Sequence, residues 1–301
     1  MKNILENKKY IFWLCAPATV LFGMFVLYPL INIFILSFQN SNGLMPATFA
    51  GLGNYMKIFT DASFNRANIA SIGLCFLAIV FDAFLAIFVA ILLSALHPLV
   101  QKLIRTAYLI PLVLSISVIS QLWLTIYHAE WGLLNSFLRA LGLEKLTHAW
   151  LIDEHTAMIC IAIVGMWWMF GMFVLLASSG IRAIPESCFE AARIDGASFF
   201  QTVRYITLPL LKSVTRTCVI IAATGGLYTF PQVFIMTGGG PGDLTQTIMM
   251  YMYRQAFSNQ RNGVAAAVGV VAVLETCVII GLVSWIFSEK QKRKDVRQNA
   301  D

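Results

Sequence analysis

Two carboxylic acids stand in the middle of long apolar runs. Asp82 lies near the centre of run 69–96 and Glu275 near the centre of run 264–287, and neither run contains Lys or Arg. A charged side chain at the centre of a membrane costs roughly 2.5–3.5 kcal/mol on insertion scales. Each acid is therefore expected to face a wet cavity, to be protonated, or to hydrogen-bond a neighbour such as Gln121. Two interpretations stay open: recognition of substrate hydroxyls along a pathway, or a hydrogen bond that holds two helices together.

A second group of polar and aromatic side chains surrounds a break in run 217–236. Gly225, Gly226 and Pro231 interrupt this run, and such breaks often lie beside a binding cavity. Sugars need flat aromatic faces for their C–H surfaces and amides or hydroxyls for their OH groups. The residues near the break supply both: Tyr228, Thr229, Phe230 and Gln232. We therefore place Tyr228, Phe230 and Gln232 with the two acids as candidate pathway residues, with ordinary helix packing as the alternative for the two aromatics. For Trp167 and Trp168 we favour packing or lipid contact.

The sequence lacks the motifs of several catalytic chemistries. It contains no G-x-x-x-x-G-K-[ST], H-E-x-x-H or G-x-S-x-G pattern. The four histidines lack ligand spacing, and the six cysteines are scattered without a C-x-x-C pair. We therefore expect neither an enzyme, nor a metal site, nor a cofactor held by this chain.

The composition indicates the elements that must position these residues. Of 301 residues, 58% are apolar and 12% are charged, which is about half the charge of an ordinary soluble domain. A membrane-crossing helix needs about 20 predominantly apolar residues, and the alternation typical of a membrane barrel is absent. The sequence therefore predicts an all-α, polytopic membrane protein with six transmembrane helices, at 11–38, 69–96, 107–127, 157–177, 217–236 and 264–287.

The basic residues predict the orientation of these helices. Of the 21 Lys and Arg residues, 15 lie in the two terminal segments and in alternate loops, and 6 lie in the remaining loops. Because basic residues concentrate on the cytoplasmic side, both termini are expected there. The net charge of +6 is explained by this topology, so no nucleic-acid partner is expected.

One cytoplasmic loop, residues 178–216, differs from a simple connector. The run Glu186–Asp195 predicts a short helix, which Gly196 ends in a left-handed conformation. A second amphipathic stretch follows, and Pro209 is expected to push Leu208 out of helical geometry. Packing on its own helices and docking on a partner are equally compatible with this composition.

The pattern within this loop is similar to a family signature. Its fixed positions match E-A-A-x3-G-x9-I-x-L-P, the signature of membrane subunits of binding-protein-dependent ABC importers: Glu190, Ala191, Ala192, Gly196, Ile206, Leu208 and Pro209. Shorter matches resemble carbohydrate-uptake permeases of the maltose-transporter type. They include F-x-G-x-x-N-Y at 49–55, T-G-G-G-P at 237–241, and Arg105, Pro111 and Trp123.

This resemblance implies a fold, a division of the chain and a set of partners. The expected fold is that of a type I ABC importer permease in the cell membrane. Residues 1–68 hold the N-terminal tail, an added span and the first outer loop, 69–287 form a five-span core with the loop 178–216, and 288–301 form a basic cytoplasmic tail. In the family, the E-A-A helix couples the membrane subunit to a separate ATPase. The implied partners are a second homologous permease, two copies of that ATPase with its ATP and Mg, an extracytoplasmic solute-binding protein and membrane lipid.

The substrate and the energy source leave alternatives. Another polar solute such as glycerol phosphate is possible within the family, although spans without Lys or Arg favour neutral glycans. A proton-coupled secondary carrier that uses Asp82 and Glu275 is the alternative from another class. That carrier leaves the signature of the cytoplasmic loop unexplained.

Overall fold

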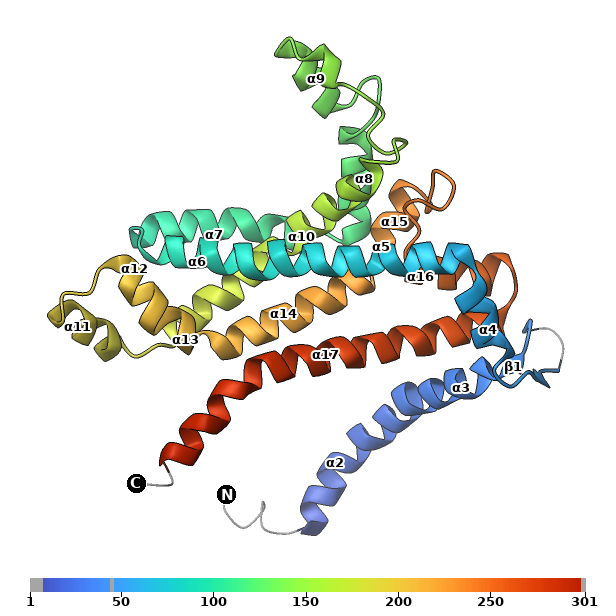
Figure 1. The fold of residues 1–301 in the computed structure, drawn as a ribbon, viewed down its shortest axis with the longest axis horizontal. Coiled ribbons are helices and arrows are strands. Elements are labelled where there is room, and N and C mark those ends of the chain that lie inside the picture. Colours follow the sequence, from blue (N-terminus) through green and yellow to red (C-terminus); the bar gives the residue numbers. More distant parts are fainter. Residues whose placement is uncertain (1–7, 44–45, 299–301) are drawn as a thin grey trace. The chain divides into compact units, whose positions relative to one another are not determined.

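The computed structural model describes residues 8–43 and 46–298, and over these it is helical apart from one short strand pair (Figure 1). Residues 1–7 of the expected N-terminal tail, residues 299–301, and the side chains of the basic tail lie outside what the structure describes. The chain divides into two compact units. One comprises the residues up to Ala62 together with Met252–Leu274, and the other comprises Ser63–Tyr251 and the residues from Glu275 onward.

The first unit contains the first span and the outer segment that follows it. Its elements, in chain order, are α2 (Lys8–Phe22), the π-helical turn η1 (Gly23–Leu27), α3 (Tyr28–Ser37), β1 (Gln39–Asn40), β2 (Thr48–Phe49), α4 (Gly53–Thr60), the π-helical turn η5 (Arg254–Ser258) and the first part of α17 (Asn262–Gln298). The two strands pair antiparallel, with Gln39 opposite Phe49.

Buried Asn54 fixes the C-terminal end of α3 in this unit. Its Nδ2 donates to the main-chain oxygens of Ser37 and Gln39, each at 2.9 Å. Tyr55 adds a hydrogen bond between its hydroxyl and Ser37 Oγ at 2.7 Å. A Cβ atom at Gly263 would collide with the carbonyl oxygen of Gln39. The Asn54-Tyr55 pair of the F-x-G-x-x-N-Y stretch therefore closes a helix end.

The second unit holds the remaining spans and the two long connections, one between α8 and α10 and one between α10 and α14. Its elements are α5 (Ala62–Ala78), the π-helical turn η2 (Ile79–Leu85), α6 (Ala86–Ser94), α7 (Pro98–Val113), α8 (Ile116–Ile126), α9 (Leu133–Ala140), the 3₁₀ turn η3 (Glu144–Leu146), α10 (Ala157–Arg182), α11 (Glu186–Ile194), α12 (Phe199–Thr202), the π-helical turn η4 (Val203–Thr207), α13 (Leu208–Leu210), α14 (Lys212–Leu227), α15 (Pro231–Met236), α16 (Ile248–Tyr253) and the second part of α17.

Small residues bring the helices of the second unit close together. α6 and α7 pack along α10, and η2 packs against α14. A Cβ atom at Gly171 of α10 would collide with the carbonyl oxygen of Tyr108 on α7, and one at Gly226 of α14 would lie 2.6 Å from Cys75 Cα on α5. Close approach through small residues is the usual way in which helices pack inside a membrane, where lipid and side chain are equally apolar.

In the described part of the chain, five helical segments have the length and hydropathy of a membrane span, and a bent helix pair makes a sixth candidate. The five are Ile11–Ser37, Ala62–Ser94, Ala157–Arg182, Lys212–Met236 and Asn262–Ser288. The sequence expectation of six spans is therefore met in number only if α7 and α8 together count as one span.

The third expected span, 107–127, is not one continuous helix. α7 and α8 meet at 98°. Leu114 is extended, and the Ser115 hydroxyl accepts a hydrogen bond from Val118 N at 3.3 Å, which starts a new helix. The indole N–H of Trp168 donates to the freed carbonyl oxygen of Leu114 at 3.1 Å. Serine capping and this tertiary contact together compensate the break.

The prediction that Pro209 pushes Leu208 out of helical geometry is wrong. Leu208 has helical φ/ψ angles of −62° and −43°, and its N–H bonds to the carbonyl of Val203. The π-helical turn 203–207 takes up the strain that Pro209 would place on a regular helix, since it shifts the hydrogen-bond register by one residue just before the proline.

Candidate functional site

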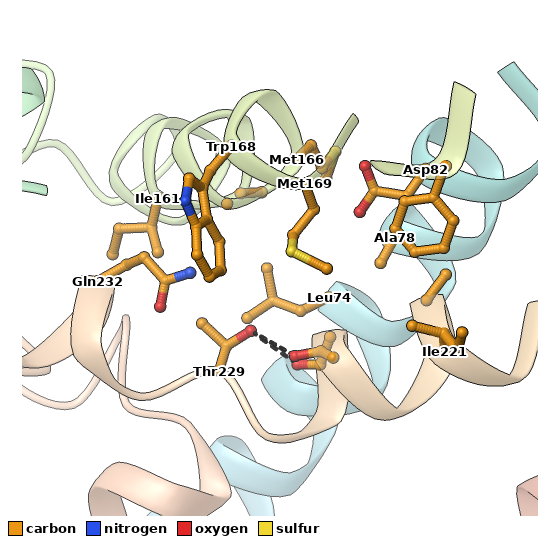
Figure 2. A pocket seen from close by; sticks show the side chains of 16 residues that line it. Leu74, Ala78, Asp82, Ile161, Met166, Trp168, Met169, Ile221, Thr229 and Gln232 are labelled. Atoms are coloured by element: carbon orange, nitrogen blue, oxygen red, sulfur yellow. Dashed lines mark hydrogen bonds between the residues drawn. The ribbon is translucent and has the colours of Figure 1, made fainter. Parts of the chain in front are cut away.

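A cavity of about 140 Å³ lies between three spans of the second unit (Figure 2). Its walls come from the α5–η2 segment, from α10, and from α14 with the start of α15. Most of the lining is apolar, and Trp168 and Met169 of α10 face the opposite wall in Figure 2. Apolar walls with a few polar groups are typical of small-molecule sites.

Two buried polar side chains line this cavity with an unpartnered oxygen each. Asp82 is 5% exposed and Gln232 is 8% exposed. Asp82 Oδ1 and Gln232 Oε1 have no hydrogen-bond partner among the described residues. A buried polar atom without a partner costs about 1–3 kcal/mol. Asp82 and Gln232 therefore bring two buried polar side chains with unsatisfied hydrogen-bonding capacity to the lining of the cavity.

Glycines make the room for this cavity. A Cβ atom at Gly225 of α14 would meet no atom within 4 Å, whereas one at Gly165 of α10 would lie 3.1 Å from Gln232 Nε2. Both glycines line the cavity. A side chain at either position would therefore reduce the space available to a ligand.

The span that supplies one wall is broken at the cavity. Residues 228–230 are not helical, and they separate α14 from α15. Thr229 Oγ1 donates to the carbonyl of Gly226 at 3.0 Å (Figure 2), and the carbonyl of Thr229 accepts from Thr247 Oγ1 at 2.7 Å. The second bond ties the loop 237–247 directly to the cavity wall.

The backbone of the loop 237–247 adopts a conformation that requires glycine at three positions. Gly238, Gly239 and Gly242 have φ angles of +60°, +88° and +59°, values that favour residues without a Cβ atom. Thr237 and Thr245 hydrogen-bond through their hydroxyls at 2.8 Å. The glycine-rich stretch therefore forms a cross-linked turn at the outer end of the broken span.

The structure gathers part of the predicted pathway set around one cavity. Asp82 and Gln232 line it, and Tyr228, Phe230 and Glu275 do not. The Tyr228 hydroxyl bonds to Thr276 Oγ1 at 2.7 Å, Phe230 stacks on Phe234, and Glu275 Oε1 accepts from Asn68 Nδ2 at 2.8 Å. The last three side chains therefore contribute to contacts between and within helices.

Three lining residues on α10 were missed or undervalued by the sequence reasoning. Gly165 and Met169 carry no polar signal, and Trp168 was assigned to packing. They share an α10 stretch, Gly165–Met169, in which glycine, methionine and tryptophan gather. That local composition was the available signal, but it does not reveal which face of the helix meets the cavity.

The signature in the loop 178–216 begins with a short helix that is capped at its C-terminal end. α11 begins after Pro185, and Gly196 follows its end with φ +72°. The N–H of Gly196 bonds to the carbonyl of Arg193 at 3.1 Å, and the N–H of Ala197 bonds to that of Ala192 at 2.9 Å. These two bonds define a Schellman cap, in which glycine at this position avoids the strain of a left-handed side-chain-bearing residue.

The next helix begins at once with a capping box. Ser198 Oγ accepts from the N–H of Gln201 at 3.4 Å, and Gln201 Oε1 accepts from the N–H of Ser198 at 2.7 Å. The two caps fix the turn between α11 and α12. In Figure 1 these helices lie at the end of the second unit where α6 gives way to α7.

This capped corner carries large apolar side chains that nothing in the described part of the chain covers. Ile194 is 87% exposed and Phe200 is 81% exposed. Glu190 and Ala191 are exposed as well, and Ala192 is buried. Exposed large apolar residues on a rigid corner are typical of a surface that meets a partner.

The comparisons with known proteins agree with a membrane permease. The family described as "Binding-protein-dependent transport system inner membrane component" matches residues 10–290. The probable ABC transporter permease YurN of Bacillus subtilis is 35% identical over 278 residues, which cover 91% of this chain and 94% of YurN. AraP of the same organism, an arabinooligosaccharides transport system permease, is 29% identical over 290 residues. The match covers 94% of this chain and 90% of AraP.

A solved structure has the same fold. A chain of the bacterial alginate ABC transporter, crystallised with an alginate-pentasaccharide-bound periplasmic protein, superposes with a TM-score of 0.83 at 20% identity. The match covers 97% of this chain and 98% of that chain.

The arrangement described above is that of a helical membrane protein with a mostly apolar cavity between three of its spans, lined in part by two buried polar side chains. The chain belongs to the inner-membrane components of binding-protein-dependent ABC transport systems. It is a multi-pass inner-membrane protein and the non-catalytic, membrane-embedded component of such a system.

Proposed function

We propose that this permease conducts a sugar or oligosaccharide that an extracytoplasmic binding protein delivers. The cavity with the unpartnered oxygens of Asp82 and Gln232 is the observation that carries this proposal. Hydroxyl groups of a sugar would donate to these two acceptors, and the ring of Trp168 offers an apolar face to its C–H surface. The arabinooligosaccharide permease AraP is a relative that spans nearly the whole chain, which supports the same substrate class.

The charge of the cavity favours a neutral glycan over a phosphate ester. None of the described residues that line it is Lys or Arg, and Asp82 is the single acid among them. A substrate with an anionic group would meet a carboxylate there without a compensating cation. Glycerol phosphate is therefore the less favoured substrate.

ATP would be hydrolysed by a separate subunit, with its Mg. The signature residues Glu190, Ala191, Ala192, Gly196, Ile206, Leu208 and Pro209 would form the transmission to two copies of that ATPase. The Schellman cap at the C-terminal end of α11 supports this role, because a helix that transmits force must not unwind at that end. Both termini would lie in the cytoplasm, and a second homologous permease would complete the translocation path.

A matched pair of glycines tests the transmission. Gly142 ends α9 with φ +73° and the same two-bond cap as Gly196, and a Cβ atom at either glycine would meet no atom within 4 Å. Proline cannot adopt a positive φ and would remove the N–H of the cap. Gly196→Pro is expected to abolish uptake while basal ATP hydrolysis continues, and Gly142→Pro is expected to keep ATP hydrolysis coupled to uptake. Normal uptake by Gly196→Pro would overturn the assignment.

The cavity is tested by replacing one carboxylate oxygen of Asp82 with an amide N–H donor. Asp82→Asn keeps the shape of the side chain but removes the charge, and it is expected to raise the KM for sugar uptake while the transporter still assembles. Uptake that is blocked by vanadate and insensitive to a protonophore would support the ATP-driven mechanism. The reverse pattern would favour a proton-coupled carrier that uses Asp82 and Glu275.

A further inference from the structure

A second, basic cavity lies at the cytoplasmic half of α7. It has a volume of about 290 Å³, and its polar lining comes from Gln101, Lys102, Arg105 and Thr106 of α7 and from Arg182 at the end of α10. None of the lining residues is Asp or Glu. Three cationic side chains therefore share one small space without an acid.

Within the described part of the chain, these cations lack anionic partners. The ion pairs found there within 4 Å include none of Lys102, Arg105 and Arg182. The Nε atom of Arg105 is buried without a hydrogen-bond partner, and Arg182 Nη2 donates a long bond of 3.4 Å to Ser179 Oγ. Two guanidinium groups at one site repel each other unless an anion lies between them, and a planar guanidinium matches the oxygens of a phosphate well.

The surface beside this cavity is aliphatic. Spacings of three and four residues place Lys102, Thr106, Ile110 and Val113 on one face of α7. All four side chains are exposed, so the face changes from cationic to apolar in the direction of the helix end. A ligand that follows this face needs an anionic head and a hydrocarbon tail.

The position of the cavity matches such a ligand. α7 begins after the short loop at 95–97, and Arg182 precedes the cytoplasmic loop 183–211, so the basic distribution of the sequence puts both at the cytoplasmic surface. The cytoplasmic leaflet carries the anionic lipids of the cell, and basic pockets between spanning helices on that side bind their head groups.

We propose that Lys102, Arg105 and Arg182 form a binding site for the phosphate of an anionic phospholipid, whose acyl chain runs along Ile110 and Val113. An acidic side chain of a partner subunit would satisfy the same charges. It would not explain why the face continues as an exposed aliphatic stripe within a spanning helix.

The test uses the permease purified in detergent with its co-purifying subunits. Native mass spectrometry during titration with dioleoyl-phosphatidylglycerol is expected to show a retained lipid adduct, and dioleoyl-phosphatidylcholine is expected to bind more weakly. Inorganic phosphate at the same concentration is expected not to displace the adduct, since it lacks the acyl chain. Equal retention of the two lipids, or displacement of the adduct by inorganic phosphate, would overturn the proposal.

Three single substitutions separate a built site from general surface charge. Arg105→Gln is expected to lower the affinity for phosphatidylglycerol about tenfold or more, because it removes a charge-assisted bond to the phosphate. Lys102→Gln, on an exposed side chain whose loss leaves packing intact, is expected to lower it about fivefold. Arg216→Gln removes an exposed cytoplasmic arginine that does not line the cavity, and its affinity is expected to remain within about twofold of that of the unchanged protein.

Two results with these variants would contradict the lipid assignment. An equal loss of affinity in the Arg105, Lys102 and Arg216 variants would indicate surface electrostatics alone. Release of the ATPase from Arg105→Gln, with unchanged lipid binding, would assign the cations to an acidic group of a partner protein.

Discussion

Two adjacent glycines on α14 are expected to respond in opposite ways to the same substitution. Gly226 touches the α5 backbone: a Cβ atom there would lie 2.6 Å from Cys75 Cα, 2.7 Å from Cys75 N and 2.7 Å from Leu74 O. Gly225, which like Gly226 lines the cavity, is exposed, and a Cβ atom there would meet nothing within 4 Å. Because main-chain atoms cannot rotate away, Gly226→Ala requires α14 to move away from α5.

The magnitudes follow from these contacts. Alanine in place of glycine favours a helix by about 0.8–1.0 kcal/mol, and this gain applies to both positions. At Gly226 it is opposed by overpacking, which typically costs about 1–3 kcal/mol and here meets three backbone atoms at once. The unfolding free energies of the two variants are therefore expected to differ by about 2–3 kcal/mol, with Gly225→Ala the more stable.

Unfolding by SDS in mixed micelles, followed by tryptophan fluorescence, measures this difference. The unchanged protein provides the reference, and Gly225→Ala is the matched control for the change in composition. A midpoint for Gly226→Ala at or above that of Gly225→Ala would refute the packing argument. Uptake adds a second readout, since Gly225→Ala is expected to reduce transport by narrowing the cavity without loss of stability.

Three further substitutions test contacts that the structure defines. Asn54→Ala removes one buried and one partly buried hydrogen bond at the C-terminal end of α3, so we expect a loss of about 2–3 kcal/mol in the same SDS titration. An unchanged midpoint would contradict the role of Asn54 in fixing this helix end. Trp168→Phe removes the donor to the carbonyl at the break in the third span, and a loss of about 1 kcal/mol is expected. The backbone N–H of His155 lowers the pKa of Asp153 below its ordinary value, so the stabilisation by Asp153 is present above that ordinary value and is lost as the pH falls through the folded-state pKa. The difference in unfolding midpoint between the unchanged protein and Asp153→Ala should therefore close on acidification, and a difference that does not depend on pH would refute this.

The helical type and the positions of five of the spans could be predicted because hydrophobic length is a local property. The break at Leu114 could not, since it depends on a serine cap and on a tryptophan from another helix. The left-handed glycine after α11 was predictable from the Asp195-Gly196 stop signal, and the structure confirms it. The helical geometry of Leu208 was not predictable, because the π-helical turn before it leaves no clear trace in the sequence.

The candidate cavity was predictable only through its polar members. Asp82 and Gln232 stand out as polar residues within apolar runs, and in the structure both line the same cavity. Glu275 is equally conspicuous, but its side chain bonds to Asn68 instead, because the rotation of a helix about its axis is set by packing. Gly165 and Met169 shape the cavity without any signal that separates them from packing residues.

The hydrogen bond from Thr247 to the carbonyl of Thr229 has a practical consequence for spectroscopy. It joins the outer loop to the non-helical segment at the cavity, so a displacement of one end is transmitted to the other over a single contact of 2.7 Å. Leu244 in that loop is exposed and can be replaced by a cysteine that carries a fluorophore. A dye at this position would report rearrangement of the cavity wall in real time from the outer surface, and Thr247→Val would uncouple the signal from the event.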